Sequence, residues 1–140
     1  MHNLGSVKPP IPYCKWVIKH KLYSIEYTSI NLYFYKADML HPSFKEKLPD
    51  VVALLGKHQI KNAFVFGSVV TQHFNEQSDI DLLITFRDGL DPLEAGEHWW
   101  NLHDELRQLF HREIDIVTER SLKNPYFIKE LDETKLLIYG

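Results

Sequence analysis

The stretch FVFGSVVTQHFNEQSDIDLLI, residues 64–84, is the part of the sequence that decides the fold. It consists of two apolar runs on either side of a polar connection, which is typical of two β-strands joined by a loop. Gly67 and Ser68 end the first run, and Asp79 and Asp81 open the second run ten residues later. Carboxylates at the mouth of a buried strand are costly unless something compensates their charge, so their purpose is the main question that the sequence raises.

The sequence on either side predicts helices and further strands. Ser43 and Glu46 have the spacing of a capping box, and Pro49 either kinks the helix that follows or marks its true first turn. The expected elements in chain order are a helix from 43 with its apolar positions at 48–55, strands at 62–66 and 79–86, a helix at about 93–110, a strand at 114–118, a short helix within 121–132 and a strand at 135–139. This order predicts an α/β (α+β) fold, a small mixed β-sheet with helices packed against it.

Length and composition indicate one globular domain. The chain has 140 residues, of which 44% are apolar and 25% charged, and Cys14 is the single cysteine, so no internal disulfide can form. No apolar run has the length of a membrane span, and the N-terminal residues lack the continuous apolar centre of a signal peptide. We therefore expect a cytoplasmic protein without a membrane partner.

The composition changes near Met39. Residues 1–38 carry a net charge of +3 and seven of the eighteen aromatic residues, whereas residues 39–140 carry a net charge of −6. The first segment is either an aromatic-rich N-terminal extension that packs on the body or on a partner, or a product of start-site choice with Met39 as the natural start. The acidic body argues against a polynucleotide substrate, because phosphate backbones are bound by basic surfaces.

The paired aspartates suggest a metal site. Side chains alternate along a strand, so Asp79 and Asp81 are expected to point to the same face, where their charges repel each other. A divalent cation such as Mg²⁺ would relieve that repulsion. Asp115 can complete a cluster of three carboxylates if its strand pairs beside 79–86. The alternatives are that Asp79 ends a turn, that Asp81 lies on an exposed edge and that Asp115 is a turn residue.

The Gly-Ser step suggests an anion site. Gly67 after a buried strand allows a phosphate or another backbone to approach closely. Ser68 can cap a short following helix, whose free N–H groups favour an anion. The alternative is an ordinary strand-to-helix turn.

The order Gly-Ser, ten residues, Asp-Ile-Asp resembles the G-S-x10-D-x-D signature of the DNA polymerase β-type nucleotidyltransferase superfamily. SDIDLLI at 78–84, IDIV at 114–117 and the closing NPYFIKEL and LLIY resemble its minimal nucleotidyltransferases, the MNT proteins. The resemblance covers residues 43–139 and implies that residues 39–140 form a minimal nucleotidyltransferase domain.

The resemblance also implies roles for individual residues. Gly67 and Ser68 would hold the phosphates of ATP, the nucleotide substrate. Asp79, Asp81 and Asp115 would be catalytic and would bind the metal, two Mg²⁺ ions. Asp115 could also help to deprotonate the acceptor hydroxyl.

The chain departs from the pattern directly after the Gly-Ser step. Many relatives continue it as G-S-x-A-R-G, whereas Thr71 stands here in place of the basic residue and Gln72 in place of the glycine. This departure bears on turnover more than on the fold or on metal binding.

MNT proteins are often paired with a HEPN-type ribonuclease toxin, and they resemble antitoxins that transfer AMP from ATP to a tyrosine of the toxin. The leading expectation is therefore a Mg²⁺-dependent protein adenylyltransferase that acts as an antitoxin, with the HEPN-type toxin as its partner. A small-molecule nucleotidyltransferase, similar to those that modify aminoglycosides, and a non-catalytic inhibitory binding module are the alternatives.

The histidines are expected to be structural. His98 and His103 are five residues apart on the helix at 93–110, a spacing that does not align two metal ligands, and His58 and His111 lie beside helix ends. His73 is expected to be a solvated surface residue.

Overall fold

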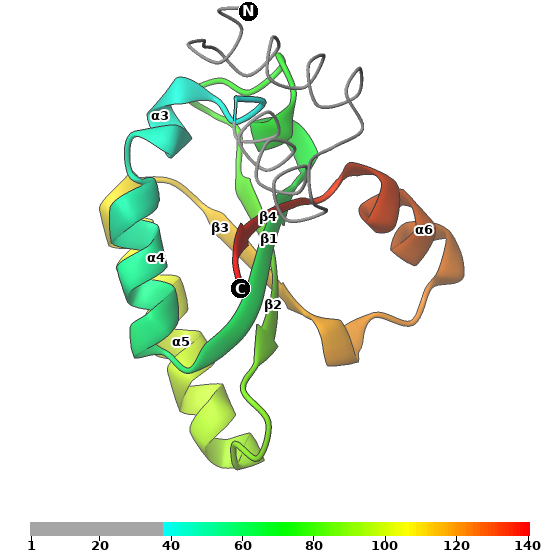
Figure 1. Ribbon diagram of the computed structural model, residues 1–140. Helices are drawn as coiled ribbons and strands as arrows, with labels where there is room; N and C mark the ends of the chain where they lie inside the picture. The colour runs from blue at the N-terminus through cyan, green and yellow to red at the C-terminus, as the bar shows by residue number, and fades with distance from the viewer. Residues whose placement is uncertain (1–37) are drawn as a thin grey trace, which may run out of the picture. The chain divides into compact units, whose positions relative to one another are not determined.

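The computed structural model describes residues 38–140, and within them Leu40–Gly140 form one compact unit. A four-stranded sheet with the strand order β3-β2-β1-β4 lies at its centre (Figure 1). The strands are β1 (Ile60–Phe66), β2 (Ile80–Phe86), β3 (Ile114–Thr118) and β4 (Leu136–Tyr139). Strand β1 is antiparallel to both β2 and β4, and β2 is parallel to β3, so the prediction of a mixed sheet is confirmed. The predicted extension, residues 1–38, lies outside the described residues apart from Asp38.

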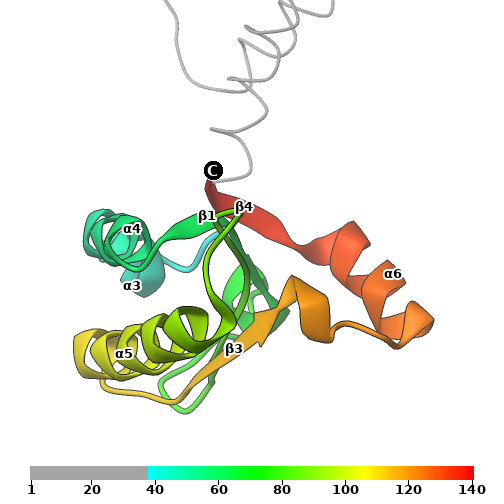
Figure 2. The ribbon, with the colours of Figure 1, turned by 90° about the horizontal axis from the view of Figure 1, so that it is seen from below.

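Helices lie on both faces of the sheet. The helical elements are α3 (Pro42–Lys45), α4 (Leu48–Lys57), the short 3-10 turns η2 (Gly67–Val70) and η3 (Glu119–Ser121), α5 (Pro92–Phe110) and α6 (Pro125–Thr134). In Figure 2 the sheet separates α4 and α5 from α6. None of the helices within residues 38–140 is long and apolar enough to cross a membrane.

The first helices begin differently from the prediction. Two helices replace the single one expected, and the cap of α3 is His41, whose Nδ1 accepts a hydrogen bond of 3.3 Å from the Ser43 N–H. The predicted capping box is therefore wrong, because Ser43 lies inside α3 and Glu46 is its C-terminal cap. Pro49 lies in the first turn of α4, where a missing N–H costs no helical hydrogen bond.

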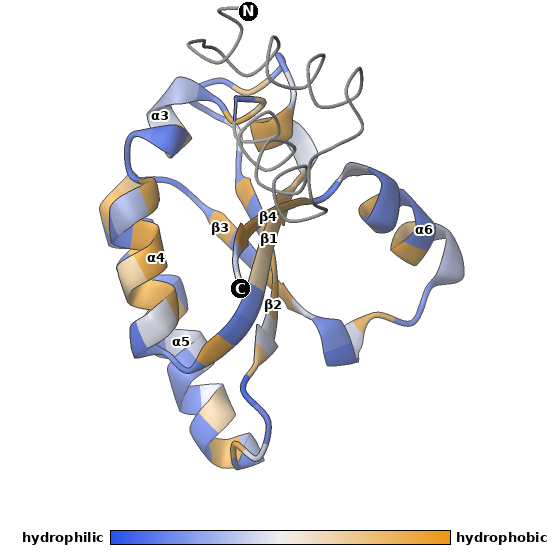
Figure 3. Ribbon diagram, in the orientation of Figure 1, coloured by the Kyte–Doolittle hydropathy of each residue, from blue (hydrophilic) through white to orange (hydrophobic). Residues whose placement is uncertain are grey.

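The two faces of the sheet carry apolar cores of different size. Strand residues such as Val65, Leu82 and Ile116 pack beneath α4 and α5 in a large buried cluster. On the opposite face, Phe66 and Leu83 form a small cluster with Leu131 of α6. Figure 3 shows hydrophobic, orange segments along the strands and along α4. The period-two alternation of strand side chains is what separates these two sets.

A polar cluster joins the end of α4 to α5. His58, the C-terminal cap of α4, is only 4% exposed. Its Nε2 lies 2.7 Å from Oε1 of Glu105, and its Nδ1 lies 3.2 Å from Nδ1 of His98. Lys57 donates to Glu105 at 2.9 Å, and this hydrogen bond, with that from His58, holds the pKa of the Glu105 carboxyl below its usual value. The cluster gives His58 and His98 structural roles, as the sequence suggested.

Replacing the buried imidazole should weaken the fold. We expect His58→Ala to lower the free energy of unfolding by about 2 kcal/mol, because it removes a buried hydrogen-bonded side chain and leaves a cavity in its place. Urea denaturation measures the change. His73→Ala, at an exposed position, is the matched control and should leave the midpoint unchanged. Equal midpoints for the two variants would contradict the structural role of His58.

Candidate active site

The turn after β1 lies very close to the Asp81 side chain. Gly67 has φ +74°, a left-handed conformation that disfavours side chains, and an added Cβ would overlap the carboxylate of Asp81. Phe66, the residue before it, is the antiparallel partner of Asp81. The glycine therefore lets the turn lie directly against the carboxylate at the start of β2.

Ser68 does not have the capping role expected from the sequence. The turn η2 begins at Gly67, and its cap residue is Phe66, which makes no side-chain hydrogen bond, so the prediction that Ser68 caps a following helix is wrong. Thr71 closes this turn instead, because its Oγ1 donates to the Ser68 carbonyl at 2.8 Å. Within the described residues, the Ser68 hydroxyl has no hydrogen-bond partner and remains free to bind a ligand.

Strand pairing brings two of the predicted carboxylates together. Asp81 of β2 and Asp115 of β3 are direct partners in the parallel ladder. Paired residues on neighbouring strands point to the same face, and here it is the face that α6 covers. Asp79 lies just before β2 and is exposed. The pairing of the Asp115 strand beside β2, which the sequence left as a condition, is thus observed.

The electrostatics of Asp81 show that the three carboxylates act on one another. Burial, together with the negative charges of Asp115 and Asp79, raises the pKa of Asp81 from 3.8 to about 6. Ionising Asp81 therefore costs more free energy in the folded protein than ionising an ordinary carboxyl, and a positive charge nearby would offset that cost.

These residues fit a divalent cation in their donor chemistry. Carboxylate oxygens are the ligands that Mg²⁺ prefers, and a cation would offset the repulsion that Asp81 experiences. As the side chains stand, no three His, Cys, Asp or Glu residues among residues 38–140 are gathered closely enough to hold a metal. Ligation by all three aspartates therefore requires their side chains to turn toward one ion.

Sequence reasoning missed a basic residue next to this group. Arg112 lies just before β3, and its Nη1 donates to the carbonyl oxygens of Asn75 and Ser78, each at 2.9 Å. Its guanidinium carbon lies 4.6 Å from the centroid of the Phe74 ring. Its position three residues before Asp115 was the one available signal, and the backbone carbonyls that it binds leave no pattern in the sequence.

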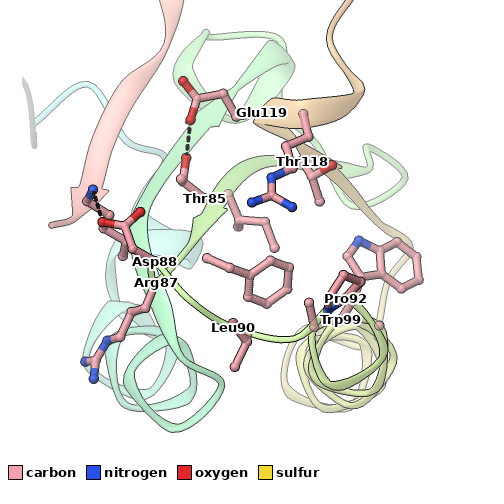
Figure 4. A pocket seen from close by; sticks show the side chains of 14 residues that line it. Thr85, Arg87, Asp88, Leu90, Pro92, Trp99, Thr118 and Glu119 are labelled. Carbon is pink, nitrogen blue, oxygen red and sulfur yellow. Dashed lines mark hydrogen bonds and ion pairs between the residues drawn. The ribbon is translucent and has the colours of Figure 1, made fainter.

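A cavity of about 580 Å³ lies elsewhere, at the far end of β2 (Figure 4). Trp99 and Pro92 of α5 form one side, and Thr85 and Glu119, joined by a hydrogen bond of 2.8 Å, form another. None of the five residues singled out from the sequence lines it. The cavity and the three carboxylates are therefore two separate candidate sites.

Comparisons with known proteins agree with the sequence pattern. Residues 50–140 match the family model described as "Polymerase beta, Nucleotidyltransferase". A provisionally named protein adenylyltransferase of Methanocaldococcus jannaschii is 36% identical over 83 residues, which are 59% of this chain and 79% of the relative. A second one from the same organism is 32% identical over 82 residues, 59% of this chain and 80% of the relative.

Two solved structures have a similar fold. A provisionally named minimal nucleotidyltransferase is 29% identical, with a TM-score of 0.54 over 66% of this chain and 90% of the other. A crystal structure of a toxin-antitoxin with AMP-PNP is 21% identical, with a TM-score of 0.53 over 66% of this chain and 73% of the other. At that identity, the second comparison shows similarity of fold alone.

Proposed function

Because the chain belongs to the polymerase beta nucleotidyltransferase family, we propose that it transfers AMP from ATP to a tyrosine hydroxyl of a partner protein, a HEPN-type toxin, and acts as its antitoxin. Nucleotidyl transfer is the reaction of the family, and the curated relatives from Methanocaldococcus jannaschii are named protein adenylyltransferases. A toxin-antitoxin with AMP-PNP shares the fold. The toxin and the tyrosine come from the resemblance to MNT proteins.

One observation carries this proposal: Asp81 and Asp115 are paired in register on parallel strands, and the Gly67 turn lies against Asp81. The pairing supports a site in which nucleotide phosphates rest on the turn while carboxylates face them. Asp115 and Asp79 are exposed, so an acceptor protein can reach them from solvent.

Each residue has a defined part in the proposed reaction. Asp79, Asp81 and Asp115 would hold Mg²⁺, which when bound neutralises charge on the phosphate oxygens. The N–H groups of the Gly67 turn and the free Ser68 hydroxyl would hold the phosphates. The acceptor oxygen forms a bond to the α-phosphorus as the bond from that phosphorus to the bridging oxygen breaks. Pyrophosphate leaves with the electron pair, and the hydroxyl proton passes to Asp115 and then to solvent.

Incubation with α-labelled ATP, MgCl₂ and the toxin tests this function. We expect label on the toxin, placed on a tyrosine by mass spectrometry, and no label with the Asp79→Asn/Asp81→Asn variant or with EDTA. Tight binding without label would favour the inhibitory module. Label on a small-molecule acceptor alone would favour the aminoglycoside-type alternative.

The cavity near Trp99 provides a test of where the nucleotide binds. A Cβ added to Gly96, one of the lining residues in α5, meets no atom within 4 Å, so Gly96→Leu is a suitable substitution for placing a larger side chain at the cavity. We expect the ATP affinity of Gly96→Leu to stay within about twofold of the wild-type value, because substitutions away from a binding site have small effects. Isothermal titration measures it. A large loss of affinity would place the nucleotide in the cavity.

A further inference from the structure

We propose that Arg112 is a positioning residue for nucleotidyl transfer, which fixes the loop 71–79 to the entrance of β3 and thereby sets Asp79 relative to the paired Asp81 and Asp115. The inference rests on the proposed function for its link to transfer. Its structural part, the anchoring of the loop, stands on the contacts of Arg112 itself.

Arg112 contacts the loop in three ways. Its Nη1 donates to the Asn75 and Ser78 carbonyl oxygens at 2.9 Å each, and its guanidinium lies over the ring of Phe74, with 4.6 Å between the guanidinium carbon and the ring centroid. Phe74 is only 6% exposed, so this ring is itself held in the core. Arginine suits the position because a planar guanidinium can donate hydrogen bonds and stack on a ring at the same time.

Apart from Arg112, the loop is held by the buried ring of Phe74, which also packs against the His41 ring with 5.0 Å between the centroids. The loop's other side-chain hydrogen bonds are local, such as Asn75 N–H to Ser78 Oγ at 3.0 Å and Gln77 N–H to Asn75 Oδ1 at 2.8 Å. Within residues 38–140, the two bonds from Arg112 are the ones that reach loop 71–79 from a side chain of another element. They are charge-assisted, a class roughly twice as strong as neutral hydrogen bonds.

Arg112 connects the two chain segments that carry Asp79 and Asp115. Ser78, whose carbonyl accepts one bond, directly precedes Asp79, and Arg112 lies three residues before Asp115 on the same strand entrance. A backbone bond from Ile80 N–H to the Glu113 carbonyl, 3.1 Å long, continues the connection where the strands begin. One guanidinium thus joins the segment that carries Asp79 to the segment that carries Asp115.

The loop that follows the Gly-Ser step contains no lysine or arginine of its own. Thr71 stands where the resemblance leads us to expect a basic residue, and its hydroxyl is bound to the Ser68 carbonyl. The cation that holds the loop comes instead from the other side, from the entrance of β3.

Arg107 provides a matched control. It lies near the end of α5, and its Nη2 donates to Glu113 Oε1 at 2.9 Å on the surface. Arg107→Gln removes the same charge beside the same strand entrance and leaves the loop contacts intact. Arg112→Gln removes charge and loop contacts together, whereas Arg112→Lys keeps the charge and can restore a single bond.

Three measurements on the full chain test the proposal: amide hydrogen exchange of residues 71–79 without nucleotide, Mn²⁺ affinity from electron paramagnetic resonance, and the rate of AMP transfer. For Arg112→Gln we expect faster exchange across the loop, and a 10- to 100-fold lower Mn²⁺ affinity and transfer rate, the size typical of residues that orient metal ligands. Arg112→Lys should fall between Arg112→Gln and the wild type, and Arg107→Gln should match the wild type.

The proposal would be overturned if Arg112→Gln kept the wild-type hydrogen-exchange protection of residues 71–79 or the wild-type Mn²⁺ affinity. It would also be overturned if Arg107→Gln and Arg112→Gln changed these quantities equally. If Arg112→Gln fails to fold, Arg112→Lys carries the test, and a slower transfer rate with wild-type exchange would again overturn it. Absence of AMP transfer by the wild-type protein would contradict the proposed function alone. In that case, loop exchange still decides whether Arg112 anchors the loop.

Discussion

Asp81→Asn is expected to lower the transfer rate by about 1,000-fold, the loss typical when one charge-stabilising group is removed from an active site. The same substitution should make the folded protein more stable at neutral pH. Loss of activity together with a gain of stability is characteristic of a residue kept for chemistry and not for folding.

The pKa of Asp81 explains the gain of stability. Its folded-state value is raised from 3.8 to about 6, first by burial and then by the charges of Asp115 and Asp79. The folded protein therefore holds this proton more tightly than the unfolded chain does. The resulting stabilisation is fully present below pH 3.8 and is lost as the pH rises through about 6. Because Asp81 is only half-buried, we discount the shift for solvent screening and expect an ionised Asp81 to cost about 1 kcal/mol at pH 7.5.

Urea denaturation at pH 4 and pH 7.5 tests this. Asp81→Asn should exceed the wild type by about 1 kcal/mol at pH 7.5 and match it at pH 4, where the carboxyl is already protonated. Asp88→Asn is the control, because Asp88 is an exposed carboxylate paired with Lys61 at 3.2 Å, and its loss should bring no gain. An Asp81→Asn variant that transfers AMP normally, or that is less stable at pH 7.5, would contradict the role given to this carboxylate.

Gly67→Ala should have the second large effect. The substitution puts a side chain at φ +74° and pushes its Cβ into the Asp81 carboxylate. We expect the free energy of unfolding to fall by about 2–3 kcal/mol, because left-handed strain and steric overlap add. Transfer should be lost as well, since the displaced carboxylate is one of the proposed metal ligands. Urea denaturation and the labelled-ATP assay measure the two effects.

Gly89→Ala separates the effect of left-handed backbone strain from the effect of steric overlap with Asp81. Gly89 has a similar φ, +83°, but a Cβ added there meets no atom within 4 Å. It should therefore show only the strain of the left-handed conformation, about 1 kcal/mol, and should leave transfer intact. If Gly67→Ala and Gly89→Ala were equally stable and equally active, the close approach of the turn to Asp81 would have no consequence.

The sequence was sufficient to predict the main architecture. Apolar runs located all four strands, and the helix expected at about 93–110 corresponds to α5. The pairing of the strands was harder to predict. The alternation of apolar and polar residues shows which side chains of one strand share a face, but it does not show which other strand lies beside that strand. The pairing of Asp81 with Asp115 depends on β2 and β3 being parallel neighbours, which the structure supplies.

Local capping and loop contacts were the least predictable features. His41 caps α3 although histidine is not among the usual capping residues, and Ser68, which is, lies inside a turn. Arg112 escaped notice because its partners are backbone carbonyls of a loop, and the carbonyl group is the same in every residue. These features depend on how the chain bends back on itself in three dimensions.

The unequal packing of the two sheet faces has an evolutionary consequence. Beneath α4 and α5 lies most of the buried apolar mass, whereas the α6 side holds only Phe66, Leu83 and Leu131 as fully buried members among the described residues. Mutations that reshape the α6 side therefore draw little on the free energy that keeps the domain folded. Substitutions on the α6 side can therefore alter the surface that the proposed acceptor would contact, while the larger core beneath α4 and α5 stays unchanged.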